Sequence, residues 1–287
     1  MRNSARGAGI GLMLLALAAG AWAAETPGRL RAQGKESVYA YAELAKGREV
    51  FDAFGSLAPG AELRYRLYPH PPRQGVGLVW RDGGGVKGTI RLAGDHSFAP
   101  AQLAGLERRN ALLVASLPPA ELSWRPVVRS SGLPANVRRL GDLRLECLVG
   151  AQGRLSLRDE RKLACLPPPE TACGEDVVAC ARRASVALGE AMLKGLTRLQ
   201  DEKNPYDQGR AQYLFISDKP VFSVALLEGG RQFTLPAIWL YGRAEPFTPF
   251  FQWPYPREYL YSVPLEVGEW SNDAQVVLEP MVAEDGK

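Results

Sequence analysis

The stretch AELRYRLY, at residues 61–68, decides the fold class of this chain. Leu63, Tyr65 and Leu67 alternate with residues that are mostly charged, which is the period-two pattern of a strand with one buried and one solvated face. Pro69 ends the strand, because proline has no N–H group to donate to a β-ladder. The stretch therefore predicts a half-buried β-strand.

Short segments of the same kind follow this strand at regular intervals, separated by turns that contain glycine or proline. The further predicted strands of this region span residues 76–80, 89–92, 112–116, 122–129 and 143–149. Short strands at this spacing are typical of antiparallel β-sandwiches, including immunoglobulin-like folds. We therefore predict that residues 56–150 form a first β-sandwich domain.

A second group of strand patterns begins near residue 213. Its members span residues 213–217, 221–227, 231–235, 259–263 and 275–279. Gly229 and Gly230 separate two of them, and such a pair is typical of a two-residue hairpin turn. Residues 210–287 are therefore predicted to form a second, aromatic-rich β-domain with a short tail.

Two segments have helical periodicity instead. Residues 37–54 place large apolar side chains near one face, which predicts a short helix within an N-terminal lead-in of residues 24–55. Residues 175–200 repeat apolar side chains at helical spacing and predict one long helix within a connector of residues 151–209. The predicted fold is mainly β, with two antiparallel β-sandwich-like domains joined by a disulfide-stapled segment that contains this long helix.

Residues 1–23 have the three parts of a secretory signal peptide. Arg2 and Arg6 are positively charged, residues 10–19 are apolar or small, and residues 21–23 (AWA) offer the small side chains that signal peptidase recognises. The apolar run is about half of the roughly 20 residues that a membrane-spanning helix needs. The pattern predicts cleavage after Ala23, a periplasmic or secreted mature protein, and no transmembrane span after cleavage.

The four cysteines lie within one short stretch, at Cys147, Cys165, Cys173 and Cys180. An even number of clustered cysteines in an exported chain predicts disulfide bonds. Sequence alone leaves the pairing of the four cysteines open, and we favour the local one, 147 with 165 and 173 with 180. Zinc sites commonly pair cysteines at closer spacing, so no metal site is expected.

The charge balance argues against a nucleic-acid-binding surface. The chain has 35 basic and 31 acidic residues, so it lacks the basic excess that a polyanion would attract. The densest basic stretch, residues 125–162, also contains Asp142, Glu146, Asp159 and Glu160. We predict a solvated surface of mixed charge there rather than an anion-binding patch.

The sequence lacks the patterns that would indicate catalysis. Its two histidines, His70 and His96, lie in predicted turns and outside any recognisable partner motif for a nucleophile. The glycine-rich residues 83–88 place Lys87 before the last glycine and precede a strand, so they predict a hairpin turn rather than a phosphate loop. We therefore favour a non-enzymatic protein without a cofactor.

The feature furthest from average composition is the segment 235–270, where prolines are threaded between aromatic residues. Proline stiffens a loop, and rigid aromatic side chains serve as binding hot spots. The candidate binding residues are Trp239, Phe250, Phe251, Trp253 and Tyr255. The alternative is that these side chains fill the core of a small β-domain, which needs many large residues.

These observations favour an exported, non-enzymatic protein that binds a protein or an envelope component through the aromatic, proline-rich loop. One alternative is a carbohydrate-binding module or glycoside hydrolase, with sugars stacked on Trp239 and Trp253 and with Glu245 or Glu258 as acid or base. Another is a structural envelope protein without a ligand. The expected partner is thus an envelope protein or a polysaccharide.

Overall fold

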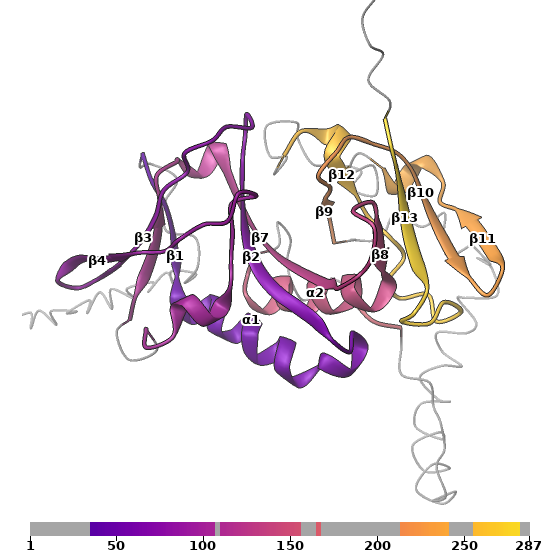
Figure 1. Cartoon of the computed structure of the whole chain (residues 1–287), viewed down its shortest axis with the longest axis horizontal. Coiled ribbons are helices and arrows are strands. Elements are labelled where there is room, and N and C mark those ends of the chain that lie inside the picture. The colour runs from indigo at the N-terminus through magenta and orange to yellow at the C-terminus, as the bar shows by residue number, and fades with distance from the viewer. Residues whose placement is uncertain (1–34, 107–109, 156–164, 168–212, 241–254, 282–287) are drawn as a thin grey trace, which may run out of the picture.

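The computed structural model describes residues 35–106, 110–155, 165–167, 213–240 and 255–281 (Figure 1). Within these residues the chain is mainly β, with antiparallel sheets and two α-helices, which confirms the fold class at this level. The predicted signal peptide and the helix predicted at residues 175–200 lie outside the described residues. Export and the long helix therefore stay predictions.

The N-terminal part, residues 35–130, contains two antiparallel sheets. The first has the strand order β1-β6-β3-β4, formed by β1 (Ser37–Ala40), β6 (Leu112–Ala115), β3 (Leu78–Asp82) and β4 (Gly85–Thr89). The second has the order β5-β2-β7, formed by β5 (Ser97–Phe98), β2 (Ala61–Pro69) and β7 (Leu122–Ser130). The two long strands, β2 and β7, pair over their whole length, and this pairing makes β7 the free edge of its sheet.

The C-terminal part combines β8 with residues 213–281. Its four-stranded sheet has the order β11-β10-β13-β8, formed by β11 (Arg231–Thr234), β10 (Val221–Glu228), β13 (Gln275–Pro280) and β8 (Val137–Arg139). A separate pair joins β9 (Phe215–Ile216) to β12 (Leu260–Tyr261). The hairpin turn predicted at Gly229 and Gly230 is confirmed, and both residues have positive φ angles, 55° and 80°, which glycine adopts without strain.

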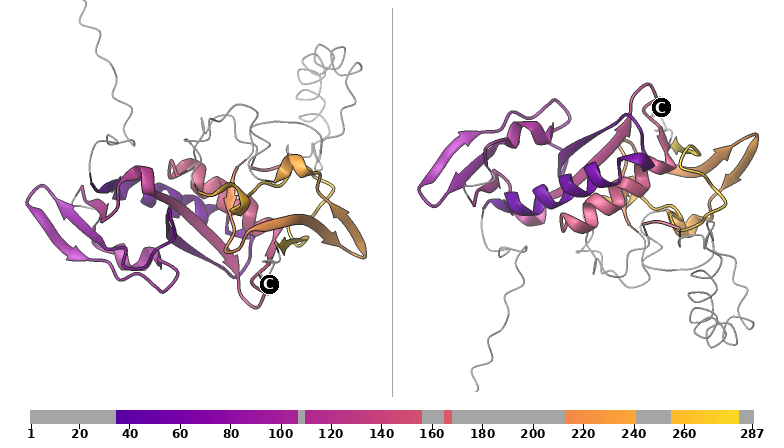
Figure 2. Two further views of the ribbon diagram at one scale, coloured as in Figure 1. Left: turned by 90° about the horizontal axis from the view of Figure 1, so that it is seen from above. Right: turned by 90° about the horizontal axis from the view of Figure 1, so that it is seen from below.

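Two helices pack against each other along one side of the sheets, α1 (Tyr41–Ala53) and α2 (Leu140–Gln152), as the view from below in Figure 2 shows. Helix α1 confirms the helix predicted at residues 37–54, although the first residues of that range form β1. The strand predicted at residues 143–149 is wrong, because these residues belong to α2. Neither of the described helices is long and apolar enough to span a membrane.

The error at residues 143–149 has a physical cause in the burial of α2. Eleven of its 13 residues are buried. A helix that is covered on all sides has no solvated face, so it lacks the one-sided apolar stripe that identifies a surface helix. Its sequence then alternates in the manner of a half-buried strand, with Leu143, Leu145, Cys147 and Val149 at every second position.

Helix α2 is buried because it lies between two hydrophobic cores. Leu145 and Val149 belong to the core of the N-terminal part. Leu140 and Leu143 belong to the core of the C-terminal part. A single helix thus contributes to both cores and crosses the domain boundary predicted at residue 150, while the division into two domains itself stays a prediction.

A disulfide between Cys147 and Cys165 fastens the last turns of α2 to residues 165–167. This confirms the first of the two favoured pairs, whereas Cys173 and Cys180 lie outside the described residues. The bridge spans a sequence separation of 18 residues. Closing a loop of that length restricts the unfolded chain and stabilises the fold by about 3 kcal/mol.

Candidate functional site

Strand β2 separates a hydrophobic core from a polar pocket. Leu63, Tyr65 and Leu67 are buried in the N-terminal core, as their alternation predicts. The other face of the strand lines the pocket, through Glu62, Arg64, Arg66 and Tyr68. Residues of β8, β9 and β12 line the same pocket, so the C-terminal part lies across from this charged face (Figure 1).

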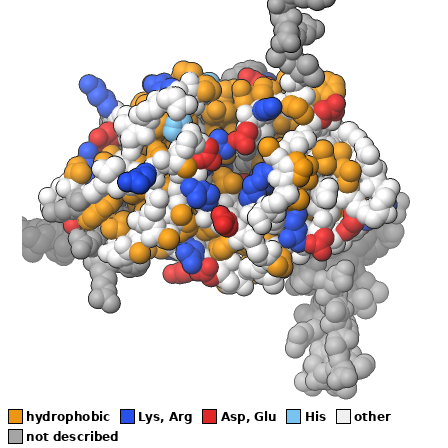
Figure 3. All heavy atoms as spheres, viewed as in Figure 1, with side chains coloured by type: hydrophobic (Ala, Val, Ile, Leu, Met, Phe, Trp, Pro, Cys, Tyr) orange, Lys and Arg blue, Asp and Glu red, His pale blue; other side chains and the backbone are white. Residues whose placement is uncertain are grey.

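The pocket has a volume of about 530 Å³, which is within the range of small-ligand sites. We call it the arginine pocket, after its four arginine side chains, Arg64, Arg66, Arg129 and Arg138. Three acidic residues line it as well, namely Glu62, Asp95 and Asp218. Figure 3 shows a hollow near the middle of this face of the molecule, with basic and acidic side chains around it.

Arg66 is held on one wall of the arginine pocket by three interactions. Its guanidinium forms an ion pair with Asp218, which follows β9, and its Nε donates to the carbonyl oxygen of Asp95 over 2.8 Å. The guanidinium also lies over the ring of Tyr68, 4.6 Å from the ring centre. Because Arg66 and Asp218 come from different parts of the chain, their ion pair joins the N-terminal wall to the C-terminal wall.

Arg129, on β7, forms no ion pair with a carboxylate of the described residues. Its Nη2 donates to the carbonyl oxygens of Pro134, over 2.6 Å, and Val137, over 3.3 Å, and so fixes the turn between β7 and β8. Burial and the nearby positive charge of Arg138 both lower the pKa of Arg129. Two like-charged side chains therefore lie near each other in the arginine pocket.

Arg138, on β8, is a buried member of the pocket lining. Its Nη2 donates to Glu146 Oε2 over 2.7 Å and to the carbonyl oxygen of Val128 over 2.6 Å. Burial, the largest single effect, would lower the pKa of Arg138, but the Glu146 carboxylate together with Tyr261 and Asp142 outweighs it, so the pKa is raised and the guanidinium is charged. Its Nε has no hydrogen-bond partner among the described residues.

The hydroxyl of Tyr261, on β12, is a second buried polar group of the pocket lining that lacks a partner in the described part of the chain. Burial raises the pKa of this hydroxyl, so it stays protonated at neutral pH. A protonated hydroxyl can donate a hydrogen bond, and so can Arg138 Nε. Buried polar groups nearly always have partners, so two such donors beside one pocket make this pocket the candidate binding site.

Helix α2 supports the pocket by covering the free edge of β7. Glu146 Oε2 accepts from the backbone N–H of Val128 over 2.9 Å, and Asp142 Oδ2 accepts from the N–H of Ser130 over 2.8 Å. An uncovered edge strand would leave these N–H groups without partners. Asp142 and Glu146 are four residues apart, so both project from one face of the helix toward the same strand.

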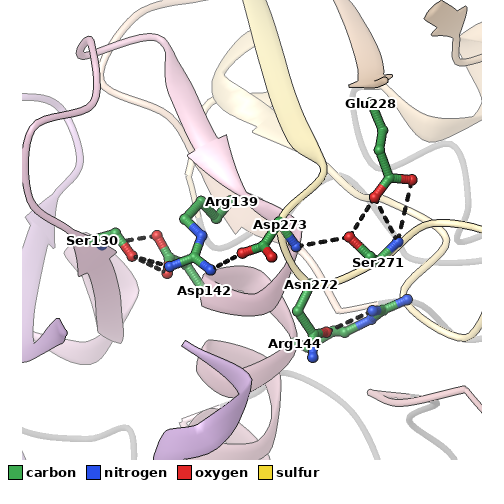
Figure 4. A network of polar contacts seen from close by, with 8 residues as sticks. All are labelled: Ser130, Arg139, Asp142, Arg144, Glu228, Ser271, Asn272 and Asp273. Carbon is green, nitrogen blue, oxygen red and sulfur yellow. Dashed lines mark hydrogen bonds and ion pairs between the residues drawn. The ribbon is translucent and has the colours of Figure 1, made fainter. Parts of the chain in front are cut away.

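The polar contacts continue from Asp142 into the C-terminal part (Figure 4). The hydroxyl of Ser130 donates to Asp142 Oδ1 over 2.8 Å and accepts from Arg139 Nη1 over 3.3 Å. Arg139 in turn forms an ion pair with Asp273. This chain of contacts fixes the ends of β7 and β8, the two strands that carry Arg129 and Arg138.

Arg144 projects from another side of α2 and holds residues 265–272. Its guanidinium donates to Asn272 Oδ1 over 2.7 Å and to three backbone carbonyl oxygens, those of Leu265, Val267 and Trp270. Burial lowers the pKa of Arg144 to about 10, which leaves the side chain charged at neutral pH. The neighbouring Ser271 donates to Glu228 of β10, so the same segment is also attached to the C-terminal sheet (Figure 4).

The aromatic residues predicted to bind a partner have different positions. Trp239 has 1% of its surface exposed and belongs to the C-terminal core, which is the alternative role that the sequence left open. Tyr255 is also buried, and its ring packs edge-on against Tyr68 of the arginine pocket, with 5.6 Å between the ring centres. Three further predicted residues lie outside the described residues: Phe250, Phe251 and Trp253.

The residues considered for catalysis do not come together in the described structure. His70 and His96 lie outside the strands, and neither lines the arginine pocket. Glu258 is exposed in a short 3₁₀-helix, and Glu245 lies outside the described residues. The described part of the chain has no group of three or more histidine, cysteine, aspartate or glutamate residues that could hold a metal ion.

The sequence alone does not predict the arginine pocket, although some of the residues that line it belong to the segments considered above. The basic stretch at residues 125–162 is predicted to be a solvated surface, and for its described residues this is wrong, since Arg125, Arg138 and Glu146 are buried. Its two described acidic residues, Asp142 and Glu146, bind the edge of β7 and Arg138 instead of facing water. The available signal was the charged half of the β2 alternation, which now forms one wall of the pocket.

Comparisons of this chain with protein-family models, with curated proteins and with solved structures give no match.

Proposed function

We propose that this chain is an exported, non-enzymatic protein that binds a protein or an envelope component, and that the arginine pocket is its binding site. The observation that carries this proposal is a pocket of about 530 Å³ beside two buried donors, Arg138 Nε and the Tyr261 hydroxyl, that have no partner among the described residues. An unpaired buried donor is unfavourable by roughly 1–3 kcal/mol, and a ligand that accepts from it removes that cost.

The chemistry of the pocket lining supports binding rather than catalysis. The described residues that line the pocket include neither histidine nor cysteine. Serine nucleophiles commonly depend on a histidine base. Two of the serines that line the pocket are already engaged, because Ser130 donates to Asp142 and Ser217 donates to backbone carbonyl oxygens. The pocket thus offers groups that hold a ligand, and no recognisable nucleophile and base.

The aromatic, proline-rich segment belongs to the same proposal. Tyr255 packs against Tyr68, and Arg66 lies over the ring of Tyr68 in the arginine pocket. One end of the predicted binding set is therefore next to the pocket. We propose that Phe250, Phe251 and Trp253 add contacts to the same partner.

A photo-crosslinking experiment in the native envelope tests the binding site. A photoreactive amino acid replaces Ser131, an exposed residue of the pocket lining, in the tagged full-length chain. A control variant carries the same group at Glu49, an exposed residue of α1. We expect one dominant adduct from position 131 and none from position 49. We expect the yield of the adduct from position 131 to fall in the double variant Phe251→Ala, Trp253→Ala. Equal labelling from both positions, or none from position 131, would contradict the proposal.

Export is tested separately by the mass of the intact protein recovered from outside the cytoplasm. The proposal expects a mature chain that begins at Ala24. A chain that retains residues 1–23 in that fraction would contradict cleavage, and a chain confined to the cytoplasm would contradict export.

A further inference from the structure

The arginine pocket also indicates the chemistry of its ligand. Resting on the proposed function, we infer that the pocket binds a carboxylate group of its ligand between Arg129, Arg138 and Tyr261. The carboxylate belongs to an acidic peptide or to an acidic sugar, since both present the same group.

The first support for this inference is the set of unpaired donors. Arg138 and Tyr261 belong to the pocket lining, and both side chains are more than nine-tenths buried. Neither Arg138 Nε nor the Tyr261 hydroxyl has a hydrogen-bond partner among the described residues. A guanidinium has donors but no acceptor, so its ligand has to supply an acceptor. A carboxylate supplies two oxygens, and hydrogen bonds to an ionised group are roughly twice as strong as neutral ones.

The second support is the distribution of charge around these donors. Arg129 and Arg138 are near enough for the charge of one to lower the pKa of the other, and Arg129 forms no ion pair with a described carboxylate. Glu146 binds Arg138 but does not line the pocket. A negative ligand group between the two arginine side chains would relieve their mutual repulsion.

The third support is that the pocket already holds a carboxylate of the chain itself. Asp218 forms its ion pair with Arg66 inside the pocket lining, and its side chain remains 58% exposed. The arginine pocket is therefore compatible with a carboxylate in contact with a guanidinium. Asp218 also adds a negative charge that repels an acidic ligand, so its removal should strengthen ligand binding.

The remaining lining residues suit a carboxylate carried on a short apolar stem. They include Val127, Leu133, Ile216 and Leu278, which are apolar. Apolar neighbours lower the local dielectric constant and strengthen a charge-assisted hydrogen bond. They also favour a ligand whose carbon atoms can leave water.

The test is a calorimetric titration of the full-length mature protein at neutral pH and low salt. The probes are N-acetylglutamate and glucuronate, with N-acetylglutamine and glucose as their neutral counterparts and inorganic phosphate as a competing anion. We expect at least one carboxylate probe to bind, its neutral counterpart not to bind, and phosphate to bind more weakly. The tighter of the two carboxylate probes assigns the source as peptide or sugar.

Variants with matched controls make the test specific to the pocket. Arg129→Gln should weaken binding of the carboxylate probe by about tenfold or more, and Tyr261→Phe should weaken it several-fold. The control Arg48→Gln removes an exposed arginine of α1, and the control Tyr213→Phe removes another buried hydroxyl. Neither control residue lines the pocket, so both variants should bind normally. Asp218→Asn should bind more tightly than the native chain.

Three results would overturn the carboxylate inference. These are equal binding of a carboxylate probe and its neutral counterpart, phosphate binding as tight as carboxylate binding, and unchanged binding in Arg129→Gln. Arg138→Gln is unsuitable as a test, because it would leave Glu146 buried without its ion-pair partner. The proposed function is tested independently of this inference. If position 131 still crosslinks its partner in the Arg129→Gln variant, binding at this site stands and only the carboxylate inference falls.

Discussion

At the residue scale, buried charges in this protein complete the hydrogen bonding of a strand edge. Asp142 is fully buried, and both of its oxygens accept hydrogen bonds from Ser130, one from the backbone N–H and one from the hydroxyl. Burying a carboxylate is unfavourable unless its oxygens are satisfied. Each oxygen of the side chain therefore has a donor, and an amide in its place would offer only one acceptor oxygen and no charge.

The substitution Asp142→Asn should lower the free energy of unfolding by about 2 kcal/mol. The reason is that the amide has a single acceptor oxygen and no charge, whereas the carboxylate accepts from both donors of Ser130 through charge-assisted hydrogen bonds. Urea denaturation at neutral pH measures the change. Glu258→Gln, at an exposed carboxylate, is the control and should leave the unfolding free energy nearly unchanged. A loss below about 0.5 kcal/mol in Asp142→Asn would contradict this account.

Glu228 gives a prediction for the dependence of stability on pH. Hydrogen bonds from Ser271 lower the pKa of Glu228 more than partial burial raises it, and Arg231 lowers it further. A carboxyl group whose pKa is lowered on folding stabilises the fold above its ordinary pKa of 4.5, and this contribution is lost as the pH falls through the lowered value. Glu228→Gln should therefore be less stable than the native chain at neutral pH, and the difference should be smaller at acidic pH, below the ordinary pKa of 4.5. An equal difference at both pH values, in urea denaturation, would contradict the assignment.

At the element scale, the sequence correctly predicts strands that have one exposed face. It does not predict helix α2, which has no exposed face. Strands β2 and β7 alternate between core and pocket, and both are predicted nearly to their ends. Helix α2 contacts two cores, so its sequence carries no solvated stripe. The arginine pocket escapes prediction for another reason. Its walls come from β2, from β7 and β8, and from β9 and β12, and these three regions are far apart in the chain. Only the fold shows that the charged face of β2 has another part of the chain across from it.

Gly141 tests how closely α2 is packed. Replacing glycine by alanine inside a helix normally stabilises it by about 1 kcal/mol. A Cβ atom at Gly141 would collide with the carbonyl oxygen of Leu57 and press on Asn272. Gly141→Ala should therefore lower the unfolding free energy by about 2 kcal/mol or more.

Gly83→Ala is the matched control for this substitution, because a Cβ atom there meets no other atom within 4 Å. Thermal unfolding of both variants distinguishes the effect of the collision at residue 141 from the general effect of replacing a glycine by alanine. A Gly141→Ala variant as stable as the native chain would mean that α2 is not held against residues 57 and 272 as described.

At the scale of the whole molecule, α2 joins the two β-rich parts through shared packing. It supplies side chains to both cores and carries the disulfide Cys147–Cys165. On one side its carboxylates bind the edge of β7, and on another Arg144 binds residues 265–272. Unfolding either part would expose one side of this helix, so the stability of each part depends on the other.

The two parts should therefore unfold together. Trp124 belongs to the N-terminal core, and Trp239 and Trp270 belong to the C-terminal core. Fluorine-labelled tryptophan reports on each position separately during urea denaturation. We expect the same midpoint for all three residues, as in a two-state transition. Midpoints that differ between Trp124 and the other two would instead indicate independent domains.

The most direct test of the central claim observes the arginine pocket itself. The Nε–H group of Arg138 is buried and has no partner among the described residues, so its NMR signal reports on an acceptor that enters the pocket. In the ¹⁵N-labelled mature protein, the account predicts that the carboxylate probe shifts this signal and slows its hydrogen exchange, while the neutral counterpart leaves it in place. A signal unaffected by carboxylate probes, while signals elsewhere in the protein respond, would contradict a carboxylate site between Arg129, Arg138 and Tyr261.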